Sequence, residues 1–267
     1  MHFPRKRFGQ HFLHDTGIIQ RIITAIAPQK EQHLVEIGPG KGALTLPLLQ
    51  QGFALDVIEF DRDLVEWLKQ NTLSSQQLNI LSADALKFDF KQLVTDKQPL
   101  RIFGNLPYNI STSLLFHLVH YNNHIQDMTF MLQKEVVDRM IATPSTKNYG
   151  RLSVMLQYYC QINKLFDVDP EAFRPPPKVN STIVQLIPHV SPPVEVINDK
   201  QLSKMVALAF SQKRKTLRNT LKNVLDADAI QAAGIDPQAR AETLTLTEFA
   251  RLANSFVNVG NSEWFSK

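Results

Sequence analysis

Short apolar runs alternate with amphipathic segments over the first two thirds of the chain. Five runs have the length and the β-branched or aromatic content of strands: HLVEIG (33–38), ALDVIEF (54–60), LNILSA (78–83), LRIFGN (100–105) and DMTFMLQ (127–133). Between them, segments 42–52, 62–70 and 112–121 repeat apolar positions with helical spacing. This alternation predicts an α/β fold, with a mostly parallel sheet covered by helices on both faces.

The pattern changes toward the C-terminus. RLSVMLQYY (151–159) predicts a helix, whereas QINKLFDV (161–168) and STIVQLIPH (181–189) predict strands that are compatible with an antiparallel edge pair. A proline-containing connector over 189–200 then leads into helical patterns alone. We therefore predict two domains: a larger α/β domain over residues 1–192, with a basic N-terminal segment, and a small helical domain over 193–267.

Two helices of the second domain carry specific signals. In FSQKRKTLRNTLKNVL (210–225), leucines and a valine share one face of a predicted amphipathic helix, and Arg214, Arg218 and Lys222 share another. Further on, Thr245 and Glu248 have the spacing of a capping box, which predicts the start of a helix.

Composition narrows the class of protein. The chain has 267 residues, 43% of them hydrophobic and 20% charged, which is typical of a globular protein. No apolar run reaches the ~18–20 residues of a membrane span, and the basic N-terminus lacks the apolar core of a secretory signal. Cys160 is the single cysteine, so an internal disulfide and a metal site built on several thiolates are excluded. We expect a cytoplasmic protein without a metal.

The basic residues are unevenly distributed. The net charge is +4 and the isoelectric point is about 9.1. Arg5, Lys6 and Arg7 precede the first acidic residue, Asp15, and the segment 200–225 holds seven basic residues and no acid. These two segments are the candidates for contacts with the phosphates of a polyanionic partner. For the second segment, a solvated amphipathic helix is the alternative.

A glycine-rich loop follows the first predicted strand. VEIGPGKGALT (35–45) places Gly38, Gly40 and Gly42 where backbone can approach a ligand before a helix begins. The loop has neither the Gly-Lys-Ser/Thr of a phosphate-binding loop nor the G-x-G-x-x-G of a dinucleotide site. A tight strand-to-helix turn is the alternative interpretation.

Acidic residues follow the next two strands. Glu59 lies about 20 residues beyond the loop, the spacing at which a carboxylate accepts from ribose hydroxyls; Asp61 and Asp63 are equal candidates. Asp84, after the third strand, could accept from an adenine amine or could cap the next helix. Because these positions meet at the carboxyl edge of a parallel sheet, they predict a site for an adenosine-bearing cofactor without a phosphate group, which indicates S-adenosylmethionine.

The fourth strand delivers GNLPYNIST (104–112) to the same edge. Pro107 cannot donate to a strand ladder, so the strand must end there. The Asn105 side-chain oxygen and the Leu106 carbonyl could accept from the amine of an extruded adenine, and Tyr108 could stack on the base. A proline turn with a core tyrosine is the alternative.

These motifs, taken in order, resemble those of the small-subunit rRNA adenine N6,N6-dimethyltransferases. The resemblance is carried by RKRFGQHFL (5–13), VEIGPGKGALT (35–45), IEFDRDL (58–64), SADALKFDF (82–90), GNLPYNIST (104–112), FMLQKEVVDRM (130–140), FRPPPKVNSTIVQL (173–186) and FSQKRKTLRNTLK (210–222). It implies a class I methyltransferase fold, a helical C-terminal domain that docks on the ribosome, and dimethylation of two adjacent adenosines in the 3′-terminal hairpin of 16S rRNA. A role in small-subunit biogenesis and a monomeric state are further expectations.

The resemblance also assigns roles to single residues. The cofactor contacts fall on His11, Leu13, Gly38, Glu59, Asp84 and Asn105. The target base falls to Asn105, Leu106 and Tyr108, with Phe173 as a second aromatic wall, although a Phe before three prolines could simply anchor a loop. Three competing functions stay open: an Erm-type methyltransferase of large-subunit rRNA, a DNA adenine methyltransferase, and a non-catalytic assembly factor on the same fold.

Overall fold

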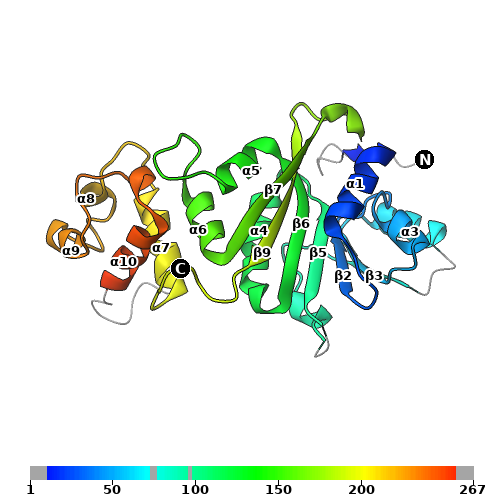
Figure 1. Cartoon of the computed structure of the whole chain (residues 1–267), viewed down its shortest axis with the longest axis horizontal. Coiled ribbons are helices and arrows are strands. Elements are labelled where there is room, and N and C mark those ends of the chain that lie inside the picture. The colour runs from blue at the N-terminus through cyan, green and yellow to red at the C-terminus, as the bar shows by residue number, and fades with distance from the viewer. Residues whose placement is uncertain (1–10, 73–76, 96–97, 257–267) are drawn as a thin grey trace. The chain divides into compact units, whose positions relative to one another are not determined.

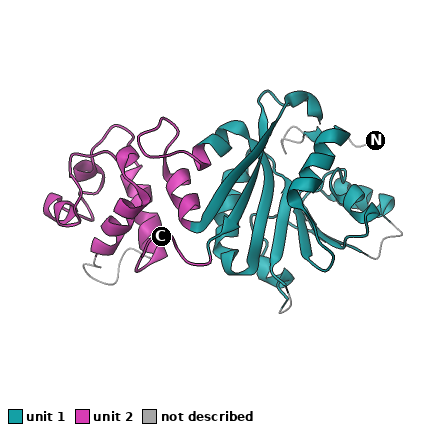
Figure 2. Ribbon diagram, in the orientation of Figure 1, with its two compact units in different colours: residues 1–138, 159–189 teal, residues 139–158, 190–267 magenta. Residues whose placement is uncertain are grey.

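The computed structural model describes residues 11–72, 77–95 and 98–256, which form two compact units. The first unit comprises residues 1–138 and 159–189, and the second comprises 139–158 and 190–267 (Figure 2). The second unit thus includes an internal segment, 139–158, that a single boundary after residue 192 leaves in the first domain. The predicted basic cluster of Arg5, Lys6 and Arg7 lies outside the described residues.

A seven-stranded sheet forms the centre of the first unit, in the order β4-β3-β2-β5-β6-β9-β7. Its strands are β2 (His33–Ile37), β3 (Leu55–Glu59), β4 (Leu78–Ser82), β5 (Leu100–Asn105), β6 (Ile125–Gln133), β7 (Cys160–Val168) and β9 (Ser181–Pro188). Of these seven strands, β9 alone runs opposite to the other six, because it pairs antiparallel with both β6 and β7. The predicted α/β fold and the antiparallel pair at the edge are confirmed.

A second, two-stranded sheet joins the start of the described chain to a distant segment. Its strands are β1 (Phe12–Leu13) and β8 (Phe173–Arg174), which pair antiparallel with Leu13 opposite Phe173. The residues next to the basic N-terminal segment are therefore held against the start of the triple-proline segment.

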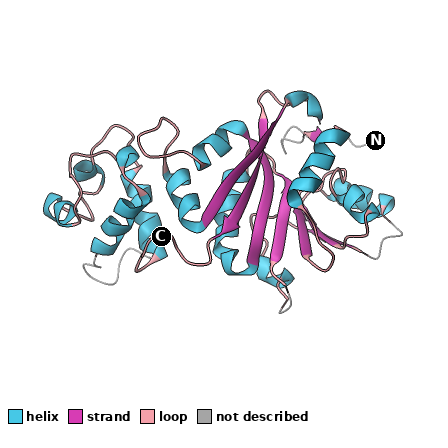
Figure 3. Cartoon of the chain, in the orientation of Figure 1, coloured by secondary structure: helices cyan, strands magenta, loops and turns pink. Residues whose placement is uncertain are grey.

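Helices cover the sheet and form most of the second unit (Figure 3). They are α1 (Thr16–Ile26), α2 (Thr45–Gln50), α3 (Arg62–Asn71), α4 (Ser111–Leu118), α5 (Lys134–Met140), α6 (Arg151–Tyr159), α7 (Asp199–Ala209), α8 (Leu217–Thr220), α9 (Ala227–Ala232) and α10 (Leu246–Ser255). In Figure 1, α1 lies in front of the sheet and α4 behind it. Strands covered on both faces explain why β2 and β5 are apolar and buried along almost their whole length.

The helix predicted over 210–225 is replaced by a shorter element, which corrects that expectation. α7 ends at Ala209, and only Leu217–Thr220 is helical in the predicted range. The Leu217 and Arg218 amides donate instead to the Ala239 and Pro237 carbonyls, both at 2.9 Å. These two amides are therefore not available for the hydrogen bonds of a continuous helix. The capping box of Thr245 and Glu248 at the start of α10 is confirmed.

Two further properties concern the described residues only. No helix among residues 11–72, 77–95 and 98–256 is long and apolar enough to cross a membrane. The same ranges hold no group of His, Cys, Asp and Glu that could bind a metal ion.

Candidate active site

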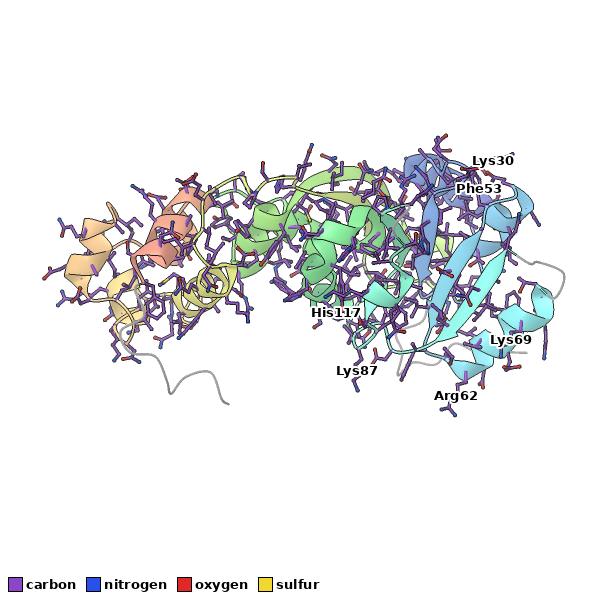
Figure 4. All side chains as sticks on the ribbon, turned by 90° about the horizontal axis from the view of Figure 1, so that it is seen from below. Lys30, Phe53, Arg62, Lys69, Lys87 and His117 are labelled. Atoms are coloured by element: carbon purple, nitrogen blue, oxygen red, sulfur yellow. The ribbon has the colours of Figure 1, made fainter. Side chains whose placement is uncertain are left out.

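A cavity of about 310 Å³ opens at the carboxyl ends of β2, β3, β4 and β5. Figure 4 shows in which direction these strands run. Lys30 and Phe53, which precede β2 and β3, lie at one end of the strands, and Arg62 and Lys87, which follow β3 and β4, lie at the other. The lining comes from β1, from the last residues of β2, β3 and β5, and from the segments that follow the four parallel strands. It brings together most of the predicted site: His11, Leu13, Gly38, Glu59, Asp84, Asn105, Leu106 and Tyr108.

The glycine loop forms the floor of the cavity. Gly38 and Gly40 have φ values of +68° and +58°, in the left-handed region that favours glycine. The Gly38 amide donates to the Ile58 carbonyl at 2.9 Å, which ties the loop to β3. This geometry lets the backbone turn sharply beside Glu59.

Glu59 ends β3 with its carboxylate almost fully buried, at 7% exposure. Its two oxygens accept from the Asp61 amide at 2.8 Å and from the Gly40 amide at 3.1 Å. Burial raises the pKa of Glu59, and these backbone hydrogen bonds oppose the rise. Since a carboxylate oxygen can accept more than one hydrogen bond, the group keeps acceptor capacity for two ribose hydroxyls. Asp61 also lines the cavity, but its carboxylate caps α3 by accepting from the Asp63 amide.

Asp84 holds a turn and lines the cavity, but it does not cap the next helical element, Phe90–Leu93, whose N-cap is Asp89. One of its carboxylate oxygens accepts from the Leu86 amide at 3.0 Å and so holds the turn after β4. The residue also lines the cavity, where its other oxygen can accept from an exocyclic amine. Phe60, the residue directly after Glu59, is 59% exposed and lines the same cavity. Sequence analysis missed Phe60, although a large apolar residue directly after a strand-end acid is a usable signal for a wall of an adenine site.

Asn105 is oriented by the N-terminal segment. Its side-chain amide donates to the His11 carbonyl at 3.2 Å, so its oxygen is left as an acceptor. The following residue, Leu106, is 1% exposed, and its amide donates to the Met131 carbonyl. The backbone of this loop is therefore anchored to β6 immediately before Pro107.

Tyr108 stands beside His11 at the mouth of the cavity. Their ring centroids are 5.8 Å apart, with an angle of 28° between the ring planes. The His11 Nδ1 donates to the Pro175 carbonyl at 2.8 Å, because a carbonyl oxygen can only accept. The Tyr108 hydroxyl lies 2.8 Å from the Ser181 hydroxyl, and burial raises the tyrosine pKa.

Phe173 does not reach the cavity, which corrects the expectation of a second aromatic wall. Its side chain is 2% exposed and belongs to the core cluster that includes Leu13, its partner in the β1–β8 pair. An aromatic ring buried in this way anchors a loop and presents no face to a base. Arg214, Arg218 and Lys222 are exposed residues of the second unit, and the cavity lining contains none of them.

Glu36 is a buried carboxyl that sequence analysis did not single out. It lies in the middle of β2, is 2% exposed, and contributes to the cavity lining. The Thr45 hydroxyl donates to it at 2.5 Å. Burial, together with the charge of Glu59, raises the pKa of Glu36 to about 8. The one signal in the sequence is that a charged residue stands inside an otherwise apolar strand, and this signal does not show what the residue does.

The sheet order, the left-handed glycine loop and the acids after β3 and β4 define a class I S-adenosylmethionine-dependent methyltransferase. A model of the ribosomal RNA adenine dimethylase family matches residues 1–258, and the chain belongs to this family. S-adenosylmethionine is therefore the methyl donor. The residues present can hold it: the Glu59 carboxylate can accept from its ribose hydroxyls, the Asp84 carboxylate can accept from its adenine amine, and the glycine loop lets the backbone approach it closely.

Relatives and solved structures agree with this membership. The chain is 53% identical over 256 residues to ribosomal RNA small subunit methyltransferase A of Acinetobacter baylyi, covering 96% of this chain and 93% of the relative. It is 54% identical over 253 residues to the Hahella chejuensis protein of the same name, covering 95% and 93%. A dimethyladenosine transferase structure from Plasmodium falciparum has a TM-score of 0.74 at 27% identity, covering 91% of this chain and 96% of that one.

Proposed function

We propose that this protein dimethylates N6 of two adjacent adenosines in the 3′-terminal hairpin of 16S rRNA on the small ribosomal subunit. Relatives with more than half of their residues identical, over almost the whole chain, carry the name ribosomal RNA small subunit methyltransferase A, which supports this substrate. A ribosomal substrate also supports a cytoplasmic location and a role in subunit biogenesis. We further propose that the protein acts as a monomer, because the first unit of a single chain supplies the glycine loop, the strand-end acids and the segment 105–108 that the proposed reaction needs.

The observation that carries the proposal is the orientation of Asn105 beside the cofactor cavity. Its amide nitrogen is committed to the His11 carbonyl, so its oxygen is presented to an incoming base. That oxygen and the Leu106 carbonyl can accept the two N6 hydrogens of an extruded adenine, which turns the nitrogen lone pair away from the ring. Tyr108, half-buried at the cavity mouth, offers the base a stacking face.

Bound S-adenosylmethionine supplies an electrophilic methyl group on a sulfonium sulfur, and this sulfur becomes a neutral thioether when the methyl group is transferred. The protein's task is to hold the N6 nitrogen in line with that methyl group and to keep the base in place. No residue has to act as a strong base, because the alkylated nitrogen is acidic and loses its proton to water. Catalysis in this site is therefore mainly positioning.

An Erm-type function on large-subunit rRNA is the competing proposal. The structure of the 23S rRNA methyltransferase ErmE has a TM-score of 0.68, but at 24% identity this likeness concerns the fold alone. The names of the relatives above 50% identity favour the small subunit.

The test is methyl transfer from labelled S-adenosylmethionine to small subunits that lack the modification, with large subunits and naked rRNA alongside. We expect up to four methyl groups on two adenosines of the small subunit. Labelling of large-subunit RNA instead would favour the Erm-type function. Cofactor binding without any labelling would favour a non-catalytic assembly factor.

A further inference from the structure

A buried hydroxyl outside the cavity is bonded to the residue that faces the target base. The Ser181 side chain is 0% exposed, and its Oγ lies 2.8 Å from the Tyr108 hydroxyl. Ser181 is not among the residues that line the cavity. The Tyr108 ring is therefore held at both ends: its Cβ atom joins it to the loop, and the hydroxyl on the opposite side of the ring is bonded to Ser181.

Ser181 is itself firmly fixed. It is the first residue of β9, where it pairs with Gln133 of β6 on one side and with Val168 of β7 on the other. The preceding residue, Asn180, accepts a hydrogen bond from the Lys134 amide at 2.9 Å. Tyr108, by contrast, belongs to the irregular segment between β5 and α4. The hydroxyl pair therefore connects a loop side chain to the first residue of β9, the strand that lies between β6 and β7 and is hydrogen-bonded to both.

We propose that Ser181 is a positioning residue that holds the Tyr108 ring as a fixed wall for the adenine, and that the second methyl transfer depends on it more than the first. This inference rests on the proposed function. It adds a residue, and the hydrogen bond through which that residue acts, to a reaction for which the sequence motifs name Asn105, Leu106, Tyr108 and Phe173.

The greater weight on the second transfer follows from counting hydrogen bonds. Unmodified adenine offers two N6 hydrogens, which the Asn105 oxygen and the Leu106 carbonyl can both accept. After the first transfer one hydrogen remains, so one of the two acceptors has no partner on the base. The monomethylated base is then held by a single hydrogen bond and by its contact with Tyr108. A tyrosine ring that has lost its anchor positions this second substrate less well.

The experiment compares Ser181→Ala, Tyr108→Phe and the double variant with wild type, on unmodified small subunits. The readout is the ratio of N6-monomethyladenosine to N6,N6-dimethyladenosine, measured by mass spectrometry after nuclease digestion at matched total methylation. We expect Ser181→Ala to raise this ratio about three- to tenfold, which corresponds to the net worth of one hydrogen bond. Because each single variant breaks the same bond, the double variant should raise the ratio no further than the larger single effect.

Thr182→Val is the matched control. Thr182 is the next residue of β9 and also 0% exposed, but its hydroxyl donates to the Asp167 carboxylate at 2.6 Å and does not contact Tyr108. We expect the control to keep the wild-type ratio, and all variants to bind S-adenosylhomocysteine with wild-type affinity. A wild-type ratio in Ser181→Ala, or an equal rise in Thr182→Val, would overturn the role proposed for Ser181 and leave the proposed function standing. If wild type itself left small-subunit adenosines unmethylated, the proposed function would fail and this inference with it.

Discussion

Glu59 is the residue that we expect to accept from the ribose hydroxyls of the cofactor. Its carboxylate is buried at the end of β3 and already accepts two backbone hydrogen bonds, so it is held in one orientation toward the cavity. A Glu59→Gln variant keeps the size but loses the charge, and a charge-assisted bond to a hydroxyl is worth about 1.5–3 kcal/mol. We expect the affinity for S-adenosylmethionine to fall about ten- to a hundredfold, measured by isothermal titration calorimetry.

Glu66→Gln is the control for that measurement. Glu66 lies on α3, is exposed, and forms a surface ion pair with Lys69 at 2.9 Å, so its loss should leave the affinity unchanged. Equal affinities for wild type and Glu59→Gln would remove Glu59 from the cofactor site. Retained binding of Glu59→Gln to small subunits, with methylation lost, would separate docking from catalysis.

Glu36 makes a prediction about pH. Its pKa of about 8 lies above the ordinary value of 4.5, so between these two pH values the folded protein holds a proton that the unfolded chain releases. Stability must therefore fall as pH rises through this window, by at most about 1.4 kcal/mol per pH unit. We expect the free energy of unfolding in urea to fall between pH 5.5 and pH 8 in wild type, and to fall less in Glu36→Gln. Parallel pH profiles for the two proteins would show that Glu36 is ionised in the folded state.

At the scale of elements, the site depends on how closely β2 and β5 approach each other. A Cβ atom on Gly104 would lie 2.3 Å from the Ile37 carbonyl oxygen, far inside any allowed contact. Gly104→Ala must therefore push the two strands apart, directly before Asn105. We expect a loss of about 1–3 kcal/mol in the free energy of unfolding, together with reduced methylation.

Gly150→Ala is the control for this substitution. A Cβ atom at Gly150, just before α6, meets no atom within 4 Å and needs no left-handed backbone. The control should be as stable as wild type or slightly more so. Should Gly104→Ala keep wild-type stability as well, the close approach of the two strands would not be a constraint.

The elements that the sequence predicts best are those whose residues are buried on both faces. The predicted range of β5, 100–105, matches the structure. β2 differs from its predicted range by one residue at one end and β3 by one residue at each end, because continuous apolar runs mark strands covered by helices. The helix over 210–225 was wrong because backbone donors of α8 bind the segment 237–239, and helical periodicity does not reveal such a contact. Similarly, the sequence around Phe173 does not distinguish a ring that faces a base from a ring that is buried in the core.

The residues of the site also divide into those that the sequence predicts and those that it does not. Glycines and strand-end acids are predictable because their spacing follows the topology of a parallel sheet. Glu36 and Ser181 escape prediction because their importance comes from partners distant in sequence or from burial, such as Tyr108 at the end of the Ser181 hydrogen bond.

At the scale of the whole molecule, the described cavity belongs entirely to the first unit. The second unit contributes no residue to its lining, yet carries exposed basic side chains on and around α8. This division predicts that substrate docking and methyl transfer can be weakened separately. Phosphate contacts from the second unit would position the ribosomal particle without taking part in the chemistry.

Replacing Arg214, Arg218 and Lys222 together by Ala tests that division. If these residues contact phosphates, small-subunit binding should weaken and the slope of log K against log salt should become shallower by roughly 2–3, because fewer counterions are released. Affinity for S-adenosylmethionine should stay at the wild-type value. A triple variant of Lys30, Lys69 and Lys91, exposed cations of the first unit, carries the same change in net charge. If both triple variants lose the same affinity and slope, general charge attraction explains the binding; if only the first does, the face around α8 lies at the interface with rRNA.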